Sequence, residues 1–508
     1  MSAAVNQSQS PWLITATVML ITIMVILDMT IVNVALPHMM GALGATSDQV
    51  TWVLTAYIVA SAIGIPLTGF LAKRLGRKRL MLISVSGFVV ASALCGQAHS
   101  LAEMVLFRVL QGAFGASVVP LSQAVLVDTF PPEQRGKAMA LWGIGIMIGP
   151  VLGPTLGGYI TQHLGWRWIF YINVPVGLMN VAMISRLIPA SARQRLSVDW
   201  LGAILMALGI GGLQVVLDRG NQENWFHSHW ITALAMLSAA ALIVFARRAW
   251  HRPDSIVPLN LLRDRNLASA SLMITVFGLG LFGTIALQPL LLERLLGYSA
   301  ETTGLVMAPR GLSSAVGMFL VARFINKLGA KRFILMGLTL AALGTYAMTF
   351  YNLTISPAWI IWPSAIQGLG MGMVFVPLST LAYQTLPASA TDHAAGIYNL
   401  SRTIGSSVGI SIVSTLLSRN AQTNWNQLGG HINGFNPSLY DWLGSQGMQL
   451  SDPLAAPLLA QELERQASML AFINVFWFVT LSFLILAPLV FLMAKGRNTG
   501  PNRSRVPH

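Results

Sequence analysis

The sequence predicts an all-α polytopic membrane protein with fourteen transmembrane helices. Hydrophobic residues make up 54% of the 508 residues, charged residues make up only 9%, and the mean hydropathy is +0.65. A soluble domain carries about 25% charged residues, so this composition is that of a chain embedded in lipid. Apolar stretches of about 20 residues, the length that crosses a bilayer, recur along the whole chain.

Each apolar stretch is assigned to one span, with boundaries uncertain by a few residues. An even number of spans places both termini on the same side of the membrane. The predicted spans lie near residues 12–36, 49–71, 80–98, 101–127, 138–160, 167–188, 199–217, 230–246, 268–291, 302–323, 333–351, 358–381, 395–417 and 471–494.

The basic residues indicate which side holds the termini. Most of the 31 lysines and arginines fall in alternate loops and in the C-terminal tail, and such residues are enriched in cytoplasmic loops. We therefore expect both termini to be cytoplasmic. The net charge of +14 is explained by this bias, so nucleic-acid binding is not expected.

An internal repeat divides the chain into two halves. LGRKR at 75–79 is echoed by LGAKR at 328–332, and Gln111-Gly112 is echoed by Gln367-Gly368, at offsets of 253 and 256 residues. Such halves rock around a site near the midplane of the membrane. The predicted organisation is an N-terminal six-helix bundle (1–190), two inserted helices (191–250), a C-terminal six-helix bundle (251–500) with a periplasmic loop (418–470), and a cytoplasmic tail (501–508).

The predicted periplasmic loop is rich in Asn, Gln, Gly and Pro, and a short helix is expected at 457–466. Loops of this length are usually functional or disordered. Docking of a partner protein, a lid and a flexible insertion are all consistent with its sequence.

Asp28 is the only acid well inside a predicted span, and an acid inside a membrane is a functional candidate by default. At about 1.5 Å per residue, Asp28 and Arg108 lie at similar depths below the outer surface, so both could face one central cavity. A carboxylate near a cation can load and release a proton as its surroundings change. The alternative is a static buried pair that holds spans 1 and 4 together.

The fifth span carries a glycine at every fourth position, which leaves a groove on one helix face where another backbone can pack. Two prolines in the same span each remove a backbone donor and bend the helix. Such a helix suits rocking against a neighbour. The residues of this motif are Gly145, Gly149, Pro150, Gly153, Pro154, Gly157 and Gly158.

Polar, aromatic and methionine side chains in the spans are candidates to line a substrate cavity. Thioethers repack readily and aromatic rings attract cations, so such a cavity would suit varied lipophilic, partly cationic molecules. Arg402, near the cytoplasmic side, is equally explained by a long side chain that reaches the interface. The candidates are Met24, Asn33, Tyr57, Gln111, Phe114, Trp142, Gln288, Gln367, Asn399 and Arg402.

The sequence offers little for an enzyme or a cofactor. A phosphate-binding Gly-Lys-Ser/Thr loop is missing, so ATP is not the expected energy source. His227 and His229 lack a supporting cluster of cysteines or carboxylates, and the single Cys95 predicts neither a disulfide nor a thiolate site. We expect no metal, no cofactor and no catalytic centre.

Several motifs resemble those of the fourteen-helix drug:proton antiporter branch of the major facilitator superfamily. The match covers essentially the whole chain, and the motifs are specific in combination. They are LDMTIVNVALP at 27–37, GFLAKRLGRKR at 69–79, RVLQG at 108–112, GIMIGPVLGPTLGG at 145–158, WRWIFYINVP at 166–175 and LDRGNQENWF at 217–226.

This resemblance implies roles for the candidate residues. Asp28 would carry the proton, Arg108 would be its partner, and the span-5 motif would be the hinge between the halves. The loop after span 2 would gate the cytoplasmic side. The family usually has Asp where this chain has Lys73, so the latch must use other contacts. The gating residues are Gly69, Lys73, Arg74, Gly76, Arg77 and Lys78.

Lys73 and the long outer loop make the chain similar to EmrB-type exporters of Gram-negative inner membranes. That likeness implies a tripartite pump with an EmrA-like periplasmic adaptor and a TolC-like outer-membrane channel. The expected function is proton-driven export of amphipathic or lipophilic toxic compounds. The alternatives are export of a narrow natural substrate, such as a fatty acid or a siderophore, a receptor or sensor that does not transport, and, third, a membrane enzyme.

Overall fold

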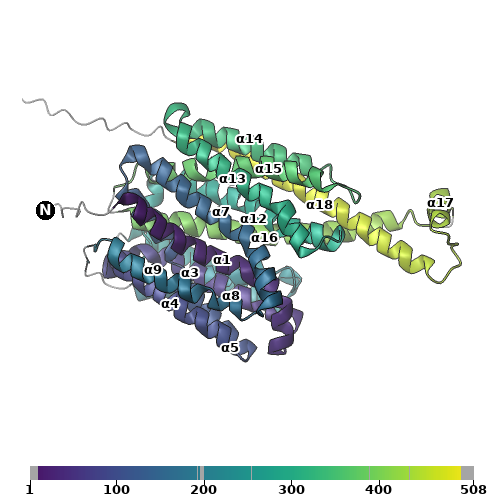
Figure 1. The fold of residues 1–508 in the computed structure, drawn as a ribbon, viewed down its shortest axis with the longest axis horizontal. Coiled ribbons are helices and arrows are strands. Elements are labelled where there is room, and N and C mark those ends of the chain that lie inside the picture. The colour runs from purple at the N-terminus through teal and green to yellow at the C-terminus, as the bar shows by residue number, and fades with distance from the viewer. Residues whose placement is uncertain are drawn as a thin grey trace, which may run out of the picture.

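A computed structural model describes residues 10–191, 193–194, 199–252, 255–387, 390–433 and 435–493. These residues are helical apart from short connections, and Figure 1 shows long helices running side by side. The start of the first helix and the end of the last long helix lie at the same end of the bundle. We call this the termini end, and the opposite end the arm end (Figure 1).

The helices of the N-terminal half pack around the first helix, α1. Two predicted spans are broken: span 4 into α5 and α6, and span 6 into α8 and α9. Pro120 and Pro175 follow the breaks by a few residues, where a proline cannot bond the carbonyl four residues earlier. The elements are α1 (Pro11–Leu43), α2 (Ser47–Val50), α3 (Trp52–Leu75), α4 (Arg77–Gln97), α5 (Leu101–Gly115), α6 (Val118–Thr129), α7 (Pro132–His163), α8 (Trp168–Tyr171) and α9 (Asn173–Leu187).

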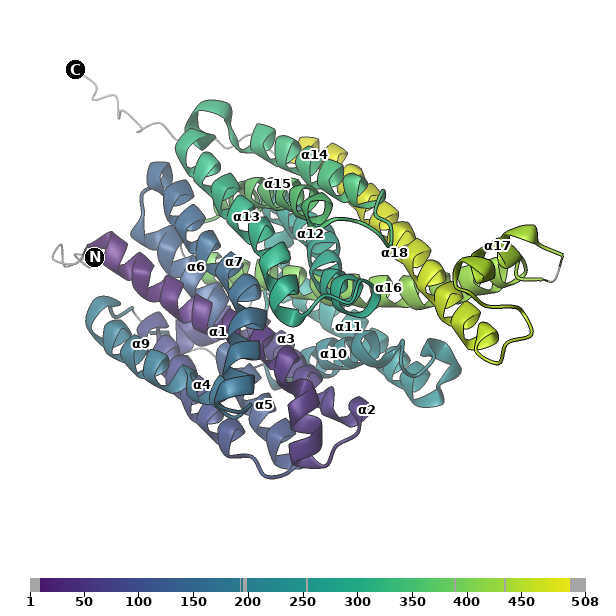
Figure 2. The same cartoon turned by 45° about the vertical axis from the view of Figure 1, so that its right-hand side comes forward.

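The helices of the C-terminal half form a second group, with α15 packed on α13 and α14, and α16 packed on α12 and α18. Figure 2 shows this group beside the first. Its elements are α12 (Arg265–Pro289), a π-helical turn (Leu290–Leu295), α13 (Ala300–Leu328), α14 (Ala330–Met348), α15 (Pro357–Tyr383), α16 (Thr391–Gly429), α17 (Pro437–Ser445) and α18 (Ala455–Leu489).

Between the halves in sequence, α10 (Trp200–Arg219) and α11 (His229–His251) form a helical pair, and α10 packs on both α3 and α16. Asp199 caps α10 through the Gly202 N–H at 3.1 Å and also accepts a 2.9 Å bond from Arg248 of α11. The hydrogen bond from Arg248 holds the pKa of the Asp199 carboxyl below its usual range. This ion pair fixes the two helices to each other at the termini end.

Twelve helical segments within the described residues are long and apolar enough to cross a membrane, so the chain is a multi-pass membrane protein. The predicted fifth and eleventh spans correspond to α7 and α14, which are outside this set of twelve. Both are long helices packed within the bundles, α7 against α1 and α13, and α14 against α15 and α18.

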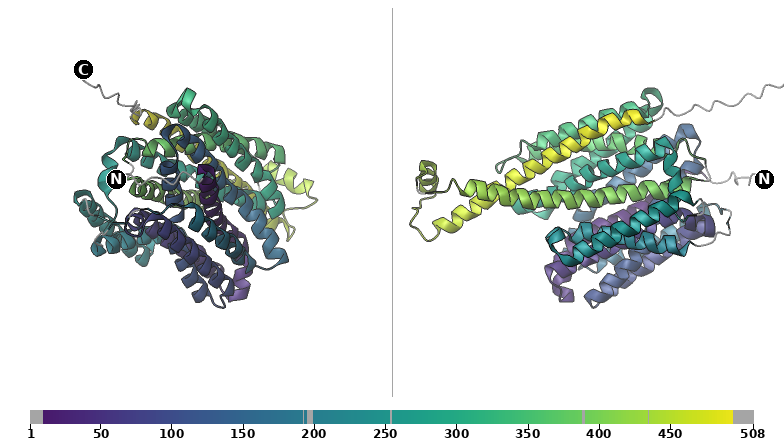
Figure 3. Two further views of the ribbon diagram at one scale, coloured as in Figure 1. Left: turned by 60° about the vertical axis from the view of Figure 1, so that its left-hand side comes forward. Right: turned by 180° about the vertical axis from the view of Figure 1, so that it is seen from behind.

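The segment predicted as a long loop at 418–470 is mostly helical, so that prediction is wrong. Helix α16 has 39 residues and α18 has 35, or about 58 and 52 Å, well beyond the ~30 Å hydrocarbon core of a bilayer. The two helices project together from the arm end, where α17 lies at the tip (Figure 1; Figure 3, right). The expected short helix at 457–466 lies inside α18. We call this projection the helical arm, residues 418–470.

Candidate functional site

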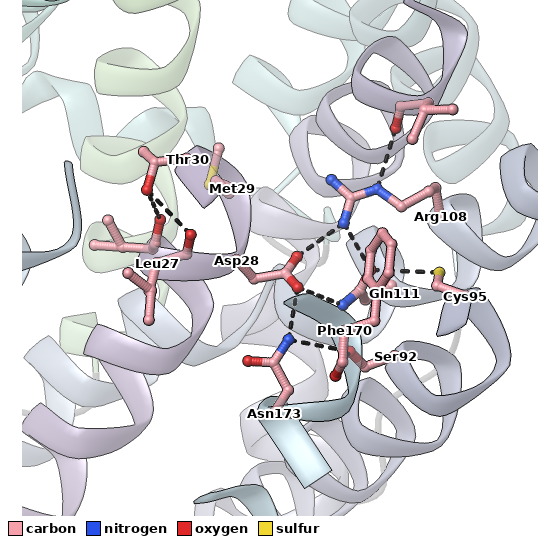
Figure 4. A network of polar contacts seen from close by, with 12 residues as sticks. Leu27, Asp28, Met29, Thr30, Ser92, Cys95, Arg108, Gln111, Phe170 and Asn173 are labelled. Atoms are coloured by element: carbon pink, nitrogen blue, oxygen red, sulfur yellow. Dashed lines mark hydrogen bonds and ion pairs between the residues drawn. The ribbon is translucent and has the colours of Figure 1, made fainter. Parts of the chain in front are cut away.

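A buried polar cluster in the N-terminal half joins the predicted pair. Arg108 Nη1 donates to Asp28 Oδ2 at 2.8 Å and to Gln111 Oε1 at 2.7 Å. Gln111 and Asn173 donate their amide protons to Asp28 Oδ1 at 3.0 and 2.7 Å. Figure 4 shows these side chains converging from α1, α5 and α9. The sequence placed Asp28 and Arg108 at one depth, and the structure places them in direct contact.

Aromatic rings and backbone carbonyls enclose the Arg108 guanidinium. It lies over the Tyr57 ring at 4.2 Å, and its Nε donates to the Val53 carbonyl at 3.1 Å. Asp28 and Arg108 each expose only 1% of their surface. The sequence suggested that both face a central cavity, but in this structure they are enclosed within the N-terminal half. The Asp28 side chain is therefore fully buried in this structure.

Asn173 is a site residue that sequence reasoning missed. It lies in the motif WRWIFYINVP, so it was part of a recognised pattern but was not assigned to Asp28. Its amide also donates to Ser92 Oγ at 3.0 Å, which ties α9 to α4. Two amides and one guanidinium thus donate hydrogen bonds to the Asp28 carboxylate.

The four glycines at every fourth position of α7 pack on α1, which belongs to the same half. A Cβ added at Gly145 would lie 2.7 Å from Met19, one at Gly149 would lie 2.6 Å from Ile26, and one at Gly157 would lie 2.9 Å from the Ile31 carbonyl oxygen. The groove therefore receives α1. Helix α7 runs without a break through positions 150 and 154, whose side chains lie outside the described residues.

The opposite half meets α7 at other positions. A Cβ at Gly143 would lie 2.9 Å from Met318 of α13, and one at Gly136 would lie 3.3 Å from Ile325 of the same helix. The Trp142 ring stacks on Phe375 of α15, with centroids 6.3 Å apart. These residues form the contact between the halves along α7, whereas the four motif glycines pack on α1 of their own half.

Adding a methyl group at Gly153 is expected to destabilise the protein, because its Cβ would overlap Thr30 of α1. For Gly153→Ala we expect a loss of about 1–3 kcal/mol, the usual cost of overpacking. Gly158→Ala is the matched control, since its nearest neighbour, Val34, would be 3.9 Å away. Thermal unfolding in detergent measures both, and equal midpoints for the two variants would contradict the assigned packing.

A charged contact joins the two halves at the termini end. Arg77, at the start of α4, donates from Nε to Asp392 of α16 at 2.8 Å and also pairs with Asp128 at the end of α6. Asp392 lies in the C-terminal half and was not predicted. Asp392 supplies a carboxylate across the interface. The loop motif after span 2 usually supplies an Asp, and this chain has Lys73 in its place. We refer to the ion pair of Arg77 with Asp392 as the latch, because it joins the two halves at the loop where the sequence predicts gating.

The other predicted gating residues surround the latch. Gly69 lies against His393, whose Cα would be 2.6 Å from an added Cβ, so α3 and α16 pack closely. Gly76 has φ of +82°, a conformation that glycine adopts without strain. Lys73 and Lys78 face the 185–194 segment through hydrogen bonds: the Lys73 carbonyl accepts from Gln194 N, and Lys78 Nζ donates to the Ser185 carbonyl. Arg74 lies over the Phe70 ring at 6.0 Å.

A second hydrogen-bonded contact between the halves centres on Gln123 of α6, another residue the sequence did not single out. Its Oε1 accepts from Tyr383 Oη at 3.0 Å and from the Asn399 amide. Asn399 therefore lies at the interface of the halves. Together with the latch, these bonds hold the two halves together toward the termini end.

The remaining cavity candidates are dispersed. Met24, Tyr57 and Gln111 are buried inside the N-terminal half, Trp142 lies between the halves, and Gln288 and Gln367 are buried inside the C-terminal half. Asn33 is exposed, and Phe114 is half-buried against Gly87. Arg402 is half-buried and forms no hydrogen bond or ion pair with another described residue. Within the described residues, no group of three or more His, Cys, Asp or Glu could hold a metal ion.

The sequence profile of the Major Facilitator Superfamily matches residues 18–410. The chain belongs to this superfamily. Its relatives include the multidrug export proteins EmrB of Haemophilus influenzae, 37% identical over 93% of both chains, and of Escherichia coli, 36% identical over 94% of both chains. The fatty acid resistance protein FarB of Neisseria gonorrhoeae is 35% identical, over 96% of this chain and 97% of its own. The family match and the relatives confirm the resemblance drawn from the motifs.

Two solved structures share the superfamily fold. The human organic anion transporter MFSD10 and the proton:xylose symporter XylE each superpose with a TM-score of 0.61 at 14% identity. The superposition covers 93% of this chain and 99% of MFSD10, and 96% of this chain and 100% of XylE. At this identity the likeness concerns the fold alone.

Proposed function

We infer that this protein is a multidrug efflux transporter of the major facilitator superfamily, and we propose that protons drive it. The multidrug function rests on the EmrB relatives, which align over nearly the whole chain. The proposal of proton coupling rests on one observation, the buried Asp28 carboxylate held by Arg108, Gln111 and Asn173. A carboxylate enclosed in a membrane helix bundle is costly to maintain and marks a functional site.

The proposed cycle alternates the surroundings of Asp28. In the enclosed state described above, three side chains donate hydrogen bonds to the carboxylate. A movement that separates α1 from α5 and α9 would remove these donors and favour uptake of a proton from the periplasmic side. Return of the donors would release the proton to the cytoplasm. Antiport then needs only that the proton and the drug are bound and released through the same alternating opening of the two halves.

We also propose that α7 and α14 cross the membrane, which gives fourteen spans with both termini in the cytoplasm. The support is that both helices pack inside the bundles alongside the twelve spans, and that Lys and Arg gather in the loops at the termini end. The latch then lies at the cytoplasmic side and the helical arm in the periplasm. The membrane is the inner membrane of a Gram-negative bacterium.

A transport assay over many compounds tests the function. Inside-out vesicles that contain the protein are energised with a proton gradient, and uptake is measured for a panel of chemically unrelated lipophilic drugs, a fatty acid and a siderophore. Uptake of many unrelated drugs is the expected result. Uptake of the fatty acid or the siderophore alone would favour a narrow exporter, and binding without uptake would favour a receptor.

We propose that the helical arm docks an EmrA-like periplasmic adaptor, which would connect the transporter to a TolC-like outer-membrane channel. Support comes from the arm's reach beyond the bilayer and from its apolar tip. Leu439 and Leu443 of α17 form a small core with Ala455. Phe435, two residues before α17, is 95% exposed and Leu454 is 66% exposed, an unusual cost for a surface in water.

Replacing these exposed side chains is expected to weaken adaptor binding. Phe435→Ser with Leu454→Ser removes apolar contact area but little packing, so the transporter should fold and still catalyse antiport in vesicles. Phe491→Ser, which removes an aromatic ring that is 73% exposed at the termini end, is the matched control. Pull-down of a purified EmrA-type adaptor should fall about tenfold or more for the double variant only. Undiminished pull-down would reject docking at the tip.

A further inference from the structure

The internal repeat allows the buried polar cluster of one half to be compared with its counterpart in the other. In the N-terminal half, Gly112 of α5 packs directly on the backbone of Tyr57 of α3. In the C-terminal half, Gly368 of α15 packs in the same way on the backbone of Arg310 of α13. The repeat offset of 253 residues also pairs Tyr57 with Arg310. Contact and sequence therefore identify Arg310 as the counterpart of Tyr57.

The counterpart cluster lacks an acid. At the 256-residue offset of the Gln-Gly echo, Asp28 corresponds to Thr284, and Arg108 corresponds to Ser364. The structure agrees with this pairing, because Gln111 Nε2 donates to Asp28, whereas Gln367 Nε2 donates to Thr284 Oγ1 at 3.4 Å. The C-terminal half thus keeps a cation, moved from the span-4 position to the span-10 position, and has lost the carboxylate that would balance it.

Arg310 is buried among neutral groups. It is 6% exposed, and it donates from Nη1 to Gln288 Oε1 at 3.0 Å and from Nη2 to Met371 Sδ at 3.6 Å. It forms no ion pair with any residue that the structure describes. Gln288 is itself held by a bond from its Nε2 to Ser364 Oγ at 2.5 Å. A buried cation without a counter-charge is strongly unfavourable, so this position calls for an anion.

The location of Arg310 fits a substrate rather than a structural ion. Met371, which accepts from the guanidinium, lies one helical turn from Phe375 on α15. Phe375 stacks on Trp142 of the other half, so the guanidinium lies beside the contact at which the two halves meet. An anion bound there would have a thioether and aromatic rings next to its charged end. These are the surroundings that an amphipathic molecule requires.

We propose that Arg310, held in place by Gln288, is a specificity residue that binds the carboxylate of lipophilic organic acids among the substrates of this transporter. The proposal rests on the export function proposed above. A guanidinium presents two parallel N–H donors that match the two oxygens of a carboxylate. Gln288 orients the guanidinium from one side, and the apolar neighbours hold the hydrocarbon part. Arg310 is thereby a specificity residue in the half opposite to Asp28.

Equilibrium binding to the purified full-length protein tests this site. The probes are dodecanoate and its methyl ester, which share a hydrocarbon chain but differ in charge. The wild type is expected to prefer the acid, and Arg310→Gln is expected to lose about tenfold to a hundredfold in affinity for the acid alone. Arg310→Lys should keep part of that affinity. Arg294→Gln, which removes an exposed arginine of the same half, should leave both affinities unchanged.

Retained ester binding shows that the Arg310→Gln protein is folded. Equal losses for acid and ester, or a wild type that does not distinguish them, would overturn the anion site. Failure of the site is separable from failure of the export function. If neutral drugs are transported while acid and ester bind alike, the site is wrong and export stands. If the acid preference depends on Arg310 but no compound is transported, the site stands and export is wrong.

Discussion

Asp28→Asn is expected to abolish drug-dependent proton movement while leaving drug binding intact. In proteoliposomes with an acidic interior, wild-type protein should discharge the gradient when drug is added outside. The variant should do so no faster than protein-free liposomes. The physical reason is that Asn keeps the shape of Asp28 and its hydrogen bonds to Gln111 and Asn173 but cannot take up a proton.

Glu464→Gln is the control for this experiment, because Glu464 is an exposed acid on the helical arm and should not affect coupling. Drug binding, measured in parallel, shows whether the Asp28 variant is folded, since the substitution leaves the buried Arg108 without its counter-charge. If wild type and Asp28→Asn discharge the gradient equally, Asp28 is structural. The coupling acid would then be sought at Asp128, Asp218 or Glu293.

Breaking the latch is expected to shift the transporter toward a state open at the termini end. Asp392→Asn removes the carboxylate that Arg77 bonds across the halves but leaves the pair of Arg77 with Asp128 in place. The side chains of Arg77 and Asp392 are 19% and 9% exposed, so the contact lies between a surface pair and a buried one. Its loss should change the ratio of the two states about tenfold, or ~1–2 kcal/mol.

Distance measurement between the halves checks this expectation. Spin labels are attached at Lys137→Cys on α7 and Lys327→Cys on α13, in a Cys95→Ser background. Double electron–electron resonance spectroscopy then reports the distance between the two labels at the termini end. Both positions are exposed, so the labels should not disturb packing. The distance distribution of Asp392→Asn should gain a longer component, and that of Asp441→Asn, an exposed acid of α17, should not. Identical distributions would remove the latch from the mechanism.

The candidate site illustrates how far sequence reasoning reaches. Asp28 was identifiable because an acid in an apolar span is conspicuous by itself, and Arg108 because it lies at a matching depth. Asn173 was not assigned although its motif was recognised, because an asparagine near a helix start is common in other roles. Arg310 was not assigned a role for a different reason. Its importance comes from the lack of an acidic partner among the described residues, and this is visible only when its neighbours in the structure are known.

The sequence by itself determined the class of the protein, the positions of most membrane helices, the repeat, and the acid that we propose as proton carrier. These follow from hydropathy, charge bias and spacing, which are properties of one segment at a time. Tertiary structure alone decided that the span-5 glycines pack on α1, that Asp392 joins Arg77, and that residues 418–470 extend two helices into an arm. Each of these depends on how helices that are distant in sequence pack against one another. The residues that they bring into contact become neighbours only when the chain has folded.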